Sequence, residues 1–311
     1  MVNERIRWRS HPRGASFGMW TAPDGMALRR MDWPAAKGET ARGSLLFAGG
    51  RGDFIEEYLE TFAHWRAAGW NVTAFDWRGQ GHSRGDIIGG NIESFDPLVD
   101  DLAALIEDMR AASPGPHVAI GHSMGGHLLL RTIVERRPAL AAAVLVAPMI
   151  GVNSGPLSAR QAAFAAGAMC RLGLGKRAMW KSRPLFEPGS IRQRNLTGSL
   201  ERYADELTWL EREPGFSLGA PSWGWLRAAL RSAAAAFAPA RLAEVETPIL
   251  ILGTERDRLV SHAEIRRVAG ALPKAELEMF PDAAHEILRE ADPVRDRALA
   301  RIDAFLDEHA R

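Results

Sequence analysis

A serine stands at the centre of the segment with the clearest chemical signal in this chain. Gly121-His122-Ser123-Met124-Gly125 fits the pattern G-x-S-x-G, between an apolar run (HVAI) and a helix-like run (MGGHLLLRTIVERR). A sharp turn from a strand into a helix lifts a serine hydroxyl clear of its surroundings, and Gly121 and Gly125 permit the close backbone approach that such an elbow needs. The pattern therefore predicts that Ser123 is a nucleophile, rather than an incidental serine in a glycine-rich turn.

A serine hydroxyl becomes an effective nucleophile only when a base accepts its proton. After a serine at such an elbow, the acid and then the histidine follow in the chain. Besides the nearby His127, the downstream histidines are His262, His285 and His309. His262 begins a predicted helix and His309 lies near the C-terminal end, whereas His285 follows the last predicted strand in the loop FPDAAHEIL. We therefore expect His285 to be the base.

The base in turn needs an acid that orients it. The candidates lie in the loop TERDR, residues 254–258, directly after the strand-like run PILILG. Glu255 is nearer the end of this strand, where solvent or a neighbouring arginine can satisfy it. We therefore expect Asp257 to be the acid.

Stabilising the negative charge that develops on an attacked carbonyl oxygen requires two backbone donors. The amide of Met124, directly after the nucleophile, is one expected donor. The other is expected from the loop AGGRGD, residues 48–53, after the run GSLLF. We assign it to the amide of Arg51, with Gly50 as the nearest rival. The alternative is a simple turn, but so many glycines after a core strand favour close approach to a ligand.

Strand-like and helix-like runs alternate along most of the chain. The apolar runs predict strands at Gly43–Phe47, Asn71–Phe75, His117–Gly121, Ala142–Val146, Pro248–Gly253 and Glu276–Phe280. Several of these runs are apolar without alternation, which is typical of parallel strands covered on both faces. Helices are predicted at Glu57–Ala68, Phe95–Ala111, Met124–Glu135, Ala263–Leu272 and Pro293–His309. The alternation predicts an α/β fold with a mostly parallel, doubly wound sheet, opened by a hairpin around Asp24-Gly25.

One interval breaks this alternation. From Gly151 to about Ala240 we find no strand-like run, and the helical patterns are interrupted by glycines and prolines. We therefore predict a core formed by residues 1–150 and 241–311, with residues 151–240 inserted as a helical cap.

Composition excludes several classes of protein. The 311 residues carry a net charge of +1, which gives no basis for a nucleic-acid partner. Cys170 is the single cysteine, so an intramolecular disulfide and a metal held by a cluster of thiols are both excluded. The N-terminal segment lacks the apolar core of a secretory signal, and the longest apolar stretch, Ala139–Val152, is too short to span a bilayer. We expect a cytoplasmic protein, with at most peripheral contact with a membrane.

Six segments together resemble one known family. They are GGRGDFIEEY, FDWRGQGHSRG, GHSMGG, GAPSWGWLRAA, ERDRLV and HEILRE, spread over nearly the whole chain. The chain resembles bacterial lysophospholipases and monoacylglycerol lipases of the α/β-hydrolase superfamily. One departure concerns the loop that should supply an oxyanion donor, because relatives often carry His-Gly where this chain has Gly49-Gly50.

The resemblance implies the α/β-hydrolase fold and hydrolysis of a single-chain lipid ester, a lysophospholipid or a monoacylglycerol. Ester hydrolysis through an acyl-enzyme requires no metal and no organic cofactor. A carboxylesterase for short soluble esters shares every catalytic residue, and a peptidase of the aminopeptidase branch belongs to the same superfamily. A non-catalytic lipid-binding or sensing protein is the alternative from another class, against which the complete set Ser123, Asp257 and His285 argues.

Other charged residues suggest local roles. Asp76 and Arg78 are expected to order the loop that contains them, and His122 is expected to pack beside the elbow; His82 receives no role. The front of the insertion is strongly basic, with Glu187 set against Arg160, Arg171, Lys176, Arg177, Lys181, Arg183, Arg192 and Arg194. This segment is either a solvated face balanced by acids elsewhere, or a face of the cap that contacts anionic membranes.

Overall fold

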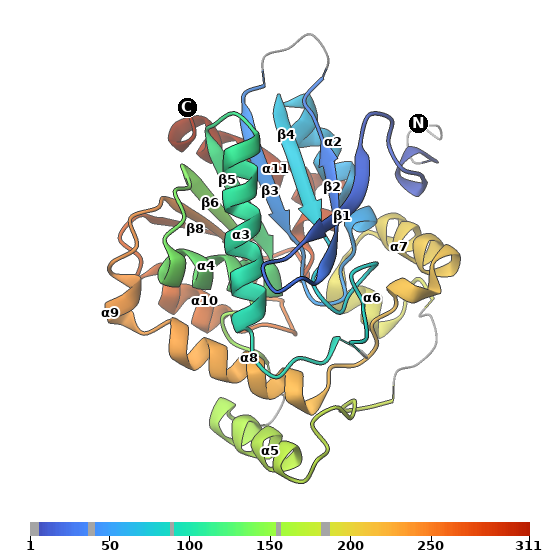
Figure 1. Ribbon diagram of the computed structural model, residues 1–311, viewed down its shortest axis with the longest axis vertical. Coiled ribbons are helices and arrows are strands. Elements are labelled where there is room, and N and C mark those ends of the chain that lie inside the picture. Colours follow the sequence, from blue (N-terminus) through green and yellow to red (C-terminus); the bar gives the residue numbers. More distant parts are fainter. Residues whose placement is uncertain (1–5, 37–40, 88–89, 154–156, 182–186) are drawn as a thin grey trace.

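A single twisted sheet forms the centre of the molecule in the computed structural model, which describes residues 6–36, 41–87, 90–153, 157–181 and 187–311 (Figure 1). The strands of the described chain are β1 (Ser16–Thr21), β2 (Ala27–Trp33), β3 (Gly43–Ala48), β4 (Trp70–Phe75), β5 (His117–His122), β6 (Ala142–Val146), β7 (Ile249–Gly253) and β8 (Ala275–Met279). Their order across the sheet is β1-β2-β4-β3-β5-β6-β7-β8. Only β2 pairs in the antiparallel sense, with β1 and β4, while β3 to β8 run parallel.

Helices cover both faces of this sheet. In the described ranges they are α2 (Leu59–Ala67), α3 (Asp96–Ala112), α4 (Met124–Arg136), α5 (Ala159–Arg171), α6 (Ile191–Leu196), α7 (Leu200–Arg212), α8 (Trp223–Ala236), α9 (Pro239–Leu242), α10 (His262–Ala269) and α11 (Asp292–His309). Short 3-10 turns lie at η1 (Ile6–Arg9), η2 (Ile55–Tyr58), η4 (Pro214–Phe216) and η5 (Ile287–Arg289). One apolar core joins α3, α4, α8 and α10 to the sheet, and a second core joins α2 and α11 to its other face.

The central strands have the burial that their sequences predict. Every residue of β3, β6 and β7 is buried, because both faces of these strands meet helices. The edge strand β1 is mostly exposed and the other edge strand, β8, is half-buried. The predicted strand positions are right to within a residue or two. The predicted helix at Glu57–Ala68 instead begins with the turn η2 before α2.

The interval that lacks strand-like runs separates β6 from β7. Its described residues form α5 to α9, and the bridge between Val152 and Val260 ties its start to the core. Helix α5 packs on α8 and lies at the lower edge of the molecule in Figure 1, and its buried side chains are Ala162 and Ala166. We propose that residues 151–240 form the cap on a core of residues 1–150 and 241–311. None of the helices in the described ranges is long and apolar enough to cross a bilayer.

Helix α4 approaches the end of β3 so closely that only glycine fits at one position. A Cβ atom at Gly125 would lie 2.0 Å from the carbonyl oxygen of Ala48 and 2.4 Å from that of Gly49. Neither backbone oxygen can move aside without shifting β3, so this glycine fixes how the helix sits against the sheet.

We expect Gly125→Ala to lower the free energy of unfolding by about 3 kcal/mol, because the new methyl group overlaps backbone atoms. Urea denaturation monitored by circular dichroism measures this change. Gly18→Ala in β1 is the matched control, since no atom lies within 4 Å of the added Cβ. We expect the control to keep or slightly raise the stability. Equal stability of the two variants would contradict the close approach.

Candidate active site

The turn at Ser123 joins β5 directly to α4. Ser123 has φ 51° and ψ −113°, a backbone conformation that costs a non-glycine residue about 1–3 kcal/mol. The amide of Ser123 donates to the carbonyl of Val146 at 2.9 Å, and its carbonyl accepts from the amides of His127 and Met149. A Cβ at Gly121 would lie 2.6 Å from the carbonyl oxygen of Gly125. The two glycines therefore permit the turn, and the hydrogen bonds hold it.

The structure brings together the three residues that the sequence selected as nucleophile, base and acid. Nε2 of His285 lies 2.8 Å from Oγ of Ser123, and Nδ1 of His285 lies 2.6 Å from Oδ2 of Asp257. All three side chains are buried. The residues follow β5, β7 and β8, whose carboxyl ends lie at the same edge of a parallel sheet. Residues that are far apart in the sequence thus form one continuous series of hydrogen bonds.

Asp257 is held as a charged acceptor. Its Oδ1 accepts from the amides of Leu259 and Val260 at 2.8 and 3.0 Å, which leaves Oδ2 for His285. Burial would raise the pKa of Asp257, but His285 and the two amides outweigh it and hold the pKa below its ordinary value. The rival acid, Glu255, pairs with Arg266 at the surface.

The loop that carries His285 is tied to the insertion. The amides of His285 and Glu286 donate to the carbonyls of Asn195 and Leu196 at 3.3 and 2.7 Å, at the end of α6. Burial would lower the pKa of His285, but the charge and hydrogen bond of Asp257 outweigh it, so this pKa lies above its ordinary value. The imidazole is therefore placed by the core on one side and by the cap on the other.

The glycine-rich loop after β3 lies against the elbow. A Cβ at Gly50 would lie 3.1 Å from Cβ of Ser123, so the loop and the nucleophile are in direct contact. The amide of Gly50 donates to Oδ2 of Asp53 at 2.6 Å. The Gly50 amide is therefore directed at Asp53, and the assignment of the second oxyanion donor to the amide of Arg51 stays a prediction. The Arg51 side chain donates to the carbonyl of Gly219 at 3.0 Å and thereby reaches the cap.

Sequence reasoning missed the role of His122. We expected this residue to pack beside the elbow, but its Nδ1 lies 2.9 Å from both Oδ2 of Asp53 and the hydroxyl of Tyr58. The His122 ring also lies 5.0 Å from the ring of His285. His122 is buried beside the elbow, as expected, and the polar partners that the sequence did not predict lie 64 and 69 positions away in the chain. Polar residues that closely follow the glycines, in GGRGDFIEEY, were the available signal.

The expected structural roles of Asp76 and Arg78 agree with their contacts. Asp76 accepts from the amides of Ile55 and His82 at 3.1 and 2.9 Å, and it joins two loops. Burial raises the pKa of Asp76 to about 6. Arg78 binds the carboxylates of Asp24 and Asp101. The ring of His82 lies 4.6 Å from that of Phe216.

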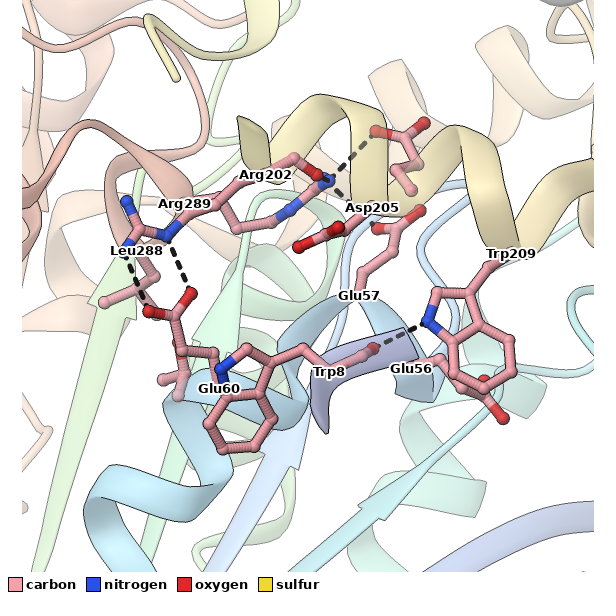
Figure 2. Close-up of a pocket in the computed structure, with 11 residues that line it drawn as sticks. Trp8, Glu56, Glu57, Glu60, Arg202, Asp205, Trp209, Leu288 and Arg289 are labelled. Carbon is pink, nitrogen blue, oxygen red and sulfur yellow. Dashed lines mark hydrogen bonds and ion pairs between the residues drawn. The ribbon is translucent and has the colours of Figure 1, made fainter. Parts of the chain in front are cut away.

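A separate cavity lies where the N-terminal turn η1, the turn η2, the insertion helix α7 and the turn η5 meet (Figure 2). Its volume of about 20 Å³ has room for about one water molecule. Trp209 donates to the carbonyl of Trp8 at 2.9 Å across it, and Arg289 lies 3.0 Å from a carboxylate oxygen of Glu206. Ser123 and His285 do not line it. This cavity therefore lies between α7 of the insertion and the turns η1, η2 and η5, and it is too small for a lipid ester.

Comparison with known proteins defines the class and then the family. A soluble variant of monoglyceride lipase from Saccharomyces cerevisiae, solved with a substrate analogue, matches with a TM-score of 0.73 at 18% identity, covering 95% of this chain and 96% of that one. The molecule thus has the α/β-hydrolase fold, as the sequence predicted. Residues 39–292 match the family model described as serine aminopeptidase, S33. The chain belongs to this family of α/β hydrolases.

Two curated relatives are similar over most of the chain. Lysophospholipase L2 of Escherichia coli (strain K12) is 30% identical over 283 residues, which cover 84% of this chain and 79% of the relative. A probable lysophospholipase L2 of Haemophilus influenzae is 28% identical over 290 residues, covering 91% and 88%. The resemblance inferred from six short motifs is therefore confirmed at the level of whole chains.

The pKa values of two buried histidines near the elbow, His285 and His127, are expected to be shifted in opposite directions. We expect the pKa of His285 to lie above the ordinary value of about 6.5, whereas burial holds the pKa of His127 at about 4. Asp257→Asn should lower the pKa of His285, because the burial remains and the opposing charge is gone. NMR titration of selectively labelled imidazoles measures both groups. Unchanged titration of His285 in the variant would contradict the assignment, and His127 is the internal control.

Proposed function

We propose that this chain hydrolyses carboxylic esters through an acyl-enzyme formed on Ser123. The observation that carries the proposal is the buried hydrogen-bonded chain from Ser123 through His285 to Asp257, with distances of 2.8 and 2.6 Å. Such a chain lets a neutral imidazole accept the serine proton while the carboxylate stabilises the imidazolium that forms. The strained elbow supports the same role, because it holds the hydroxyl at the edge of the sheet.

Each step of the reaction has a named residue. His285 accepts the proton of Ser123 as Oγ attacks the ester carbonyl carbon, and the carbonyl electron pair moves onto oxygen. The amides of Met124 and Arg51 donate to this oxyanion; Met124 is the first residue of α4, where helix amides lack intrahelical acceptors. The oxyanion collapses, the C–O bond breaks, and His285 gives its proton to the leaving alcohol. Water then attacks the acyl-enzyme, its proton passing through His285 to Ser123.

The raised pKa of His285 sets the direction of the pH dependence. The base must be neutral to accept the serine proton, so activity falls as the pH drops through this pKa. The shift from Asp257 therefore moves the acidic limb of the profile to higher pH than an isolated imidazole would give.

The proposed substrate is a single-chain lipid ester, a lysophospholipid or a monoacylglycerol. The support comes from the names of the relatives, two lysophospholipases and a monoglyceride lipase, together with a family match over residues 39–292. A largely apolar helix of the cap, α8, carries the conspicuous motif SWGWLRAA and contacts the oxyanion loop, with Arg51 lying 5.2 Å from the ring of Trp225. Apolar side chains of such a helix would favour an acyl chain packed against them, because each buried methylene contributes about 0.8 kcal/mol.

We expect a fluorophosphonate probe to label wild-type protein at Ser123 and to leave Ser123→Ala unlabelled. Peptide mass spectrometry locates the adduct. Hydrolysis should rise along a series of p-nitrophenyl esters from acetate to long acyl chains, and lysophospholipid should be cleaved. Labelling at Ser123 together with faster hydrolysis of the acetate ester would support the acyl-enzyme mechanism. It would indicate short soluble esters, and not lipid esters, as the substrates. Absence of labelling would contradict catalysis and favour a lipid-binding protein.

We further propose that the cap of a cytoplasmic enzyme contacts anionic membranes through one surface. This surface, the cap patch, combines Phe164, Leu172 and Trp180, exposed by 76%, 73% and 57%, with the exposed basic residues Arg160, Arg171, Lys176, Arg177 and Lys181. An exposed apolar group among cations suits the interface of an anionic bilayer. Such contact would bring the site to substrates that reside in the bilayer.

Not all of the basic residues predicted for this face belong to the cap patch. Arg192 turns inward, where it bonds the hydroxyl of Tyr203 at 3.0 Å and lies 2.7 Å from Glu206. Arg194 donates to the carbonyl of Gly189, and Arg183 lies outside the described residues. Of the described basic residues of this segment, five face solvent around α5 and the residues that follow it, and Arg194 faces solvent in α6.

We expect Arg171→Glu, Lys176→Glu and Arg177→Glu in combination to weaken binding to phosphatidylglycerol-containing vesicles by roughly 100-fold or more, since each basic residue at an anionic surface contributes about 1 kcal/mol. Sedimentation with vesicles measures the affinity, and pure phosphatidylcholine vesicles provide the neutral reference. Reversing Arg137, Arg241 and Lys274, three exposed basic residues of the core, is the matched control. Equal loss in both triple variants, or loss in neither, would contradict the cap patch.

A further inference from the structure

Several of the polar contacts around the oxyanion loop are made to one carboxylate, that of Asp53. A single oxygen of Asp53, Oδ2, accepts from the amide of Gly50 at 2.6 Å and from the hydroxyl of Tyr58 at 2.9 Å. The same oxygen lies 2.9 Å from Nδ1 of His122, the neighbour of the nucleophile. Asp53 therefore connects the loop after β3 to the end of β5. The proposed acyl transfer leaves this carboxylate without a role.

Polar contacts fix the oxyanion loop at three backbone positions on either side of Arg51. The indole of Trp77 donates to the carbonyl of Gly49 at 2.7 Å, Asp53 accepts from the amide of Gly50, and Gln80 accepts from the amide of Gly52 at 2.6 Å. A cavity of about 10 Å³, lined in part by Gly49 and Asp53, lies beside the loop. The hydrogen bonds therefore restrain the position of the loop together with its packing against Ser123 and Asp53.

Small movements of this loop change the distance to the nucleophile. A Cβ at Gly50 would lie 3.1 Å from Cβ of Ser123 and 3.1 Å from Nδ1 of His122. The peptide between Gly50 and Arg51 follows directly, and it carries the amide proposed to meet the oxyanion. A donor displaced by about 1 Å from its productive position can cost about 10²-fold in rate.

We propose that Asp53 is a positioning residue for this hydrolase: through the amide of Gly50 and the imidazole of His122, it holds the oxyanion loop so that the Arg51 amide points at the developing negative charge. The inference rests on the proposed function, because it assigns a role within the same site. Asp53 does not touch the reacting atoms and acts through the backbone of the loop.

The protonation states of the partners suit this role. Burial would raise the pKa of Asp53, but the charge and hydrogen bond of His122, with those of Gly50 and Tyr58, hold it well below its usual range. Burial, with Asp53 next in effect, raises the pKa of Tyr58 well above its ordinary value, so its hydroxyl keeps the proton that it donates. Hydrogen bonds to an ionised carboxylate are about twice as strong as neutral ones. Asp53→Asn replaces the charged carboxylate by an amide of the same shape. The substitution therefore weakens the hydrogen bonds to the oxyanion loop without leaving a cavity.

The test compares Asp53→Asn with wild type in the hydrolysis of a p-nitrophenyl ester. We expect kcat to fall about 100-fold while KM stays within about threefold, because loss of one oriented oxyanion donor costs about 10²–10³ in kcat. The rate of fluorophosphonate labelling at Ser123 should fall in parallel, since its phosphoryl oxygen occupies the same donors. Asp76→Asn is the matched control, because Asp76 is a nearby carboxylate, buried even more deeply than Asp53, that accepts from loop amides outside the oxyanion loop. We expect this control to lower thermal stability but to leave kcat within about threefold.

Two results would overturn the inference: folded Asp53→Asn with kcat within threefold of wild type, or equal falls in kcat for Asp53→Asn and Asp76→Asn. If Asp53→Asn does not fold, Tyr58→Phe decides, because it removes one donor to Asp53 and keeps the carboxylate. We expect a roughly fivefold lower kcat at unchanged KM, in line with one lost hydrogen bond of about 1 kcal/mol, and unchanged kcat would again overturn the inference. Failure of the proposed function is distinguishable, since wild type itself would then neither label nor hydrolyse.

Discussion

The two hydrogen bonds of the His285 imidazole constrain the rest of the structure, because they join residues from three separate loops. Ser123 follows β5, Asp257 follows β7 and His285 follows β8. Distances of 2.8 and 2.6 Å between these side chains require the ends of the strands to lie side by side at fixed spacing. The parallel pairing from β5 to β8 supplies this spacing. The buried apolar strands therefore serve the chemistry by holding short polar loops in place.

The site also depends on contacts from outside the sheet. The loop of His285 rests on the carbonyls of Asn195 and Leu196 in the cap, and Arg51 donates to the carbonyl of Gly219 in the cap. The cap thus contacts both the base and the oxyanion loop. At the joint of Figure 2, Arg289 lies between carboxylates that include Glu206 of α7, so buried ion pairs set how the cap meets the core. A buried pair of this kind stabilises a specific arrangement only while both partners remain, because a single buried charge is costly.

The sequence was sufficient to predict those features that a local sequence pattern indicates. Unbroken apolar runs identified β3, β6 and β7 because parallel strands covered on both faces need no polar face. The elbow could be recognised because its turn demands glycines at fixed positions. The order of serine, acid and histidine then selected Asp257 and His285, and the structure brings both to Ser123.

Other features depend on contacts between residues that are far apart in the sequence. Local sequence patterns do not predict these contacts. His122 looked like a packing residue, but Asp53 and Tyr58 make it part of a polar cluster. Arg192 looked like part of a basic surface, but Glu206 draws it inward. In both cases the local sequence is compatible with two environments for the side chain. A residue far away in the sequence determines which of the two is found in the structure.

The most direct measurement of the central claim is the mass of the enzyme during turnover. Wild-type protein is mixed with a p-nitrophenyl ester, quenched in acid within the first turnovers, and digested for peptide mass spectrometry. The account predicts that the peptide containing Ser123 carries the acyl group, and that Ser123→Ala shows no adduct and almost no hydrolysis. Hydrolysis by Ser123→Ala near the wild-type rate, or an acyl group on another residue, would contradict it.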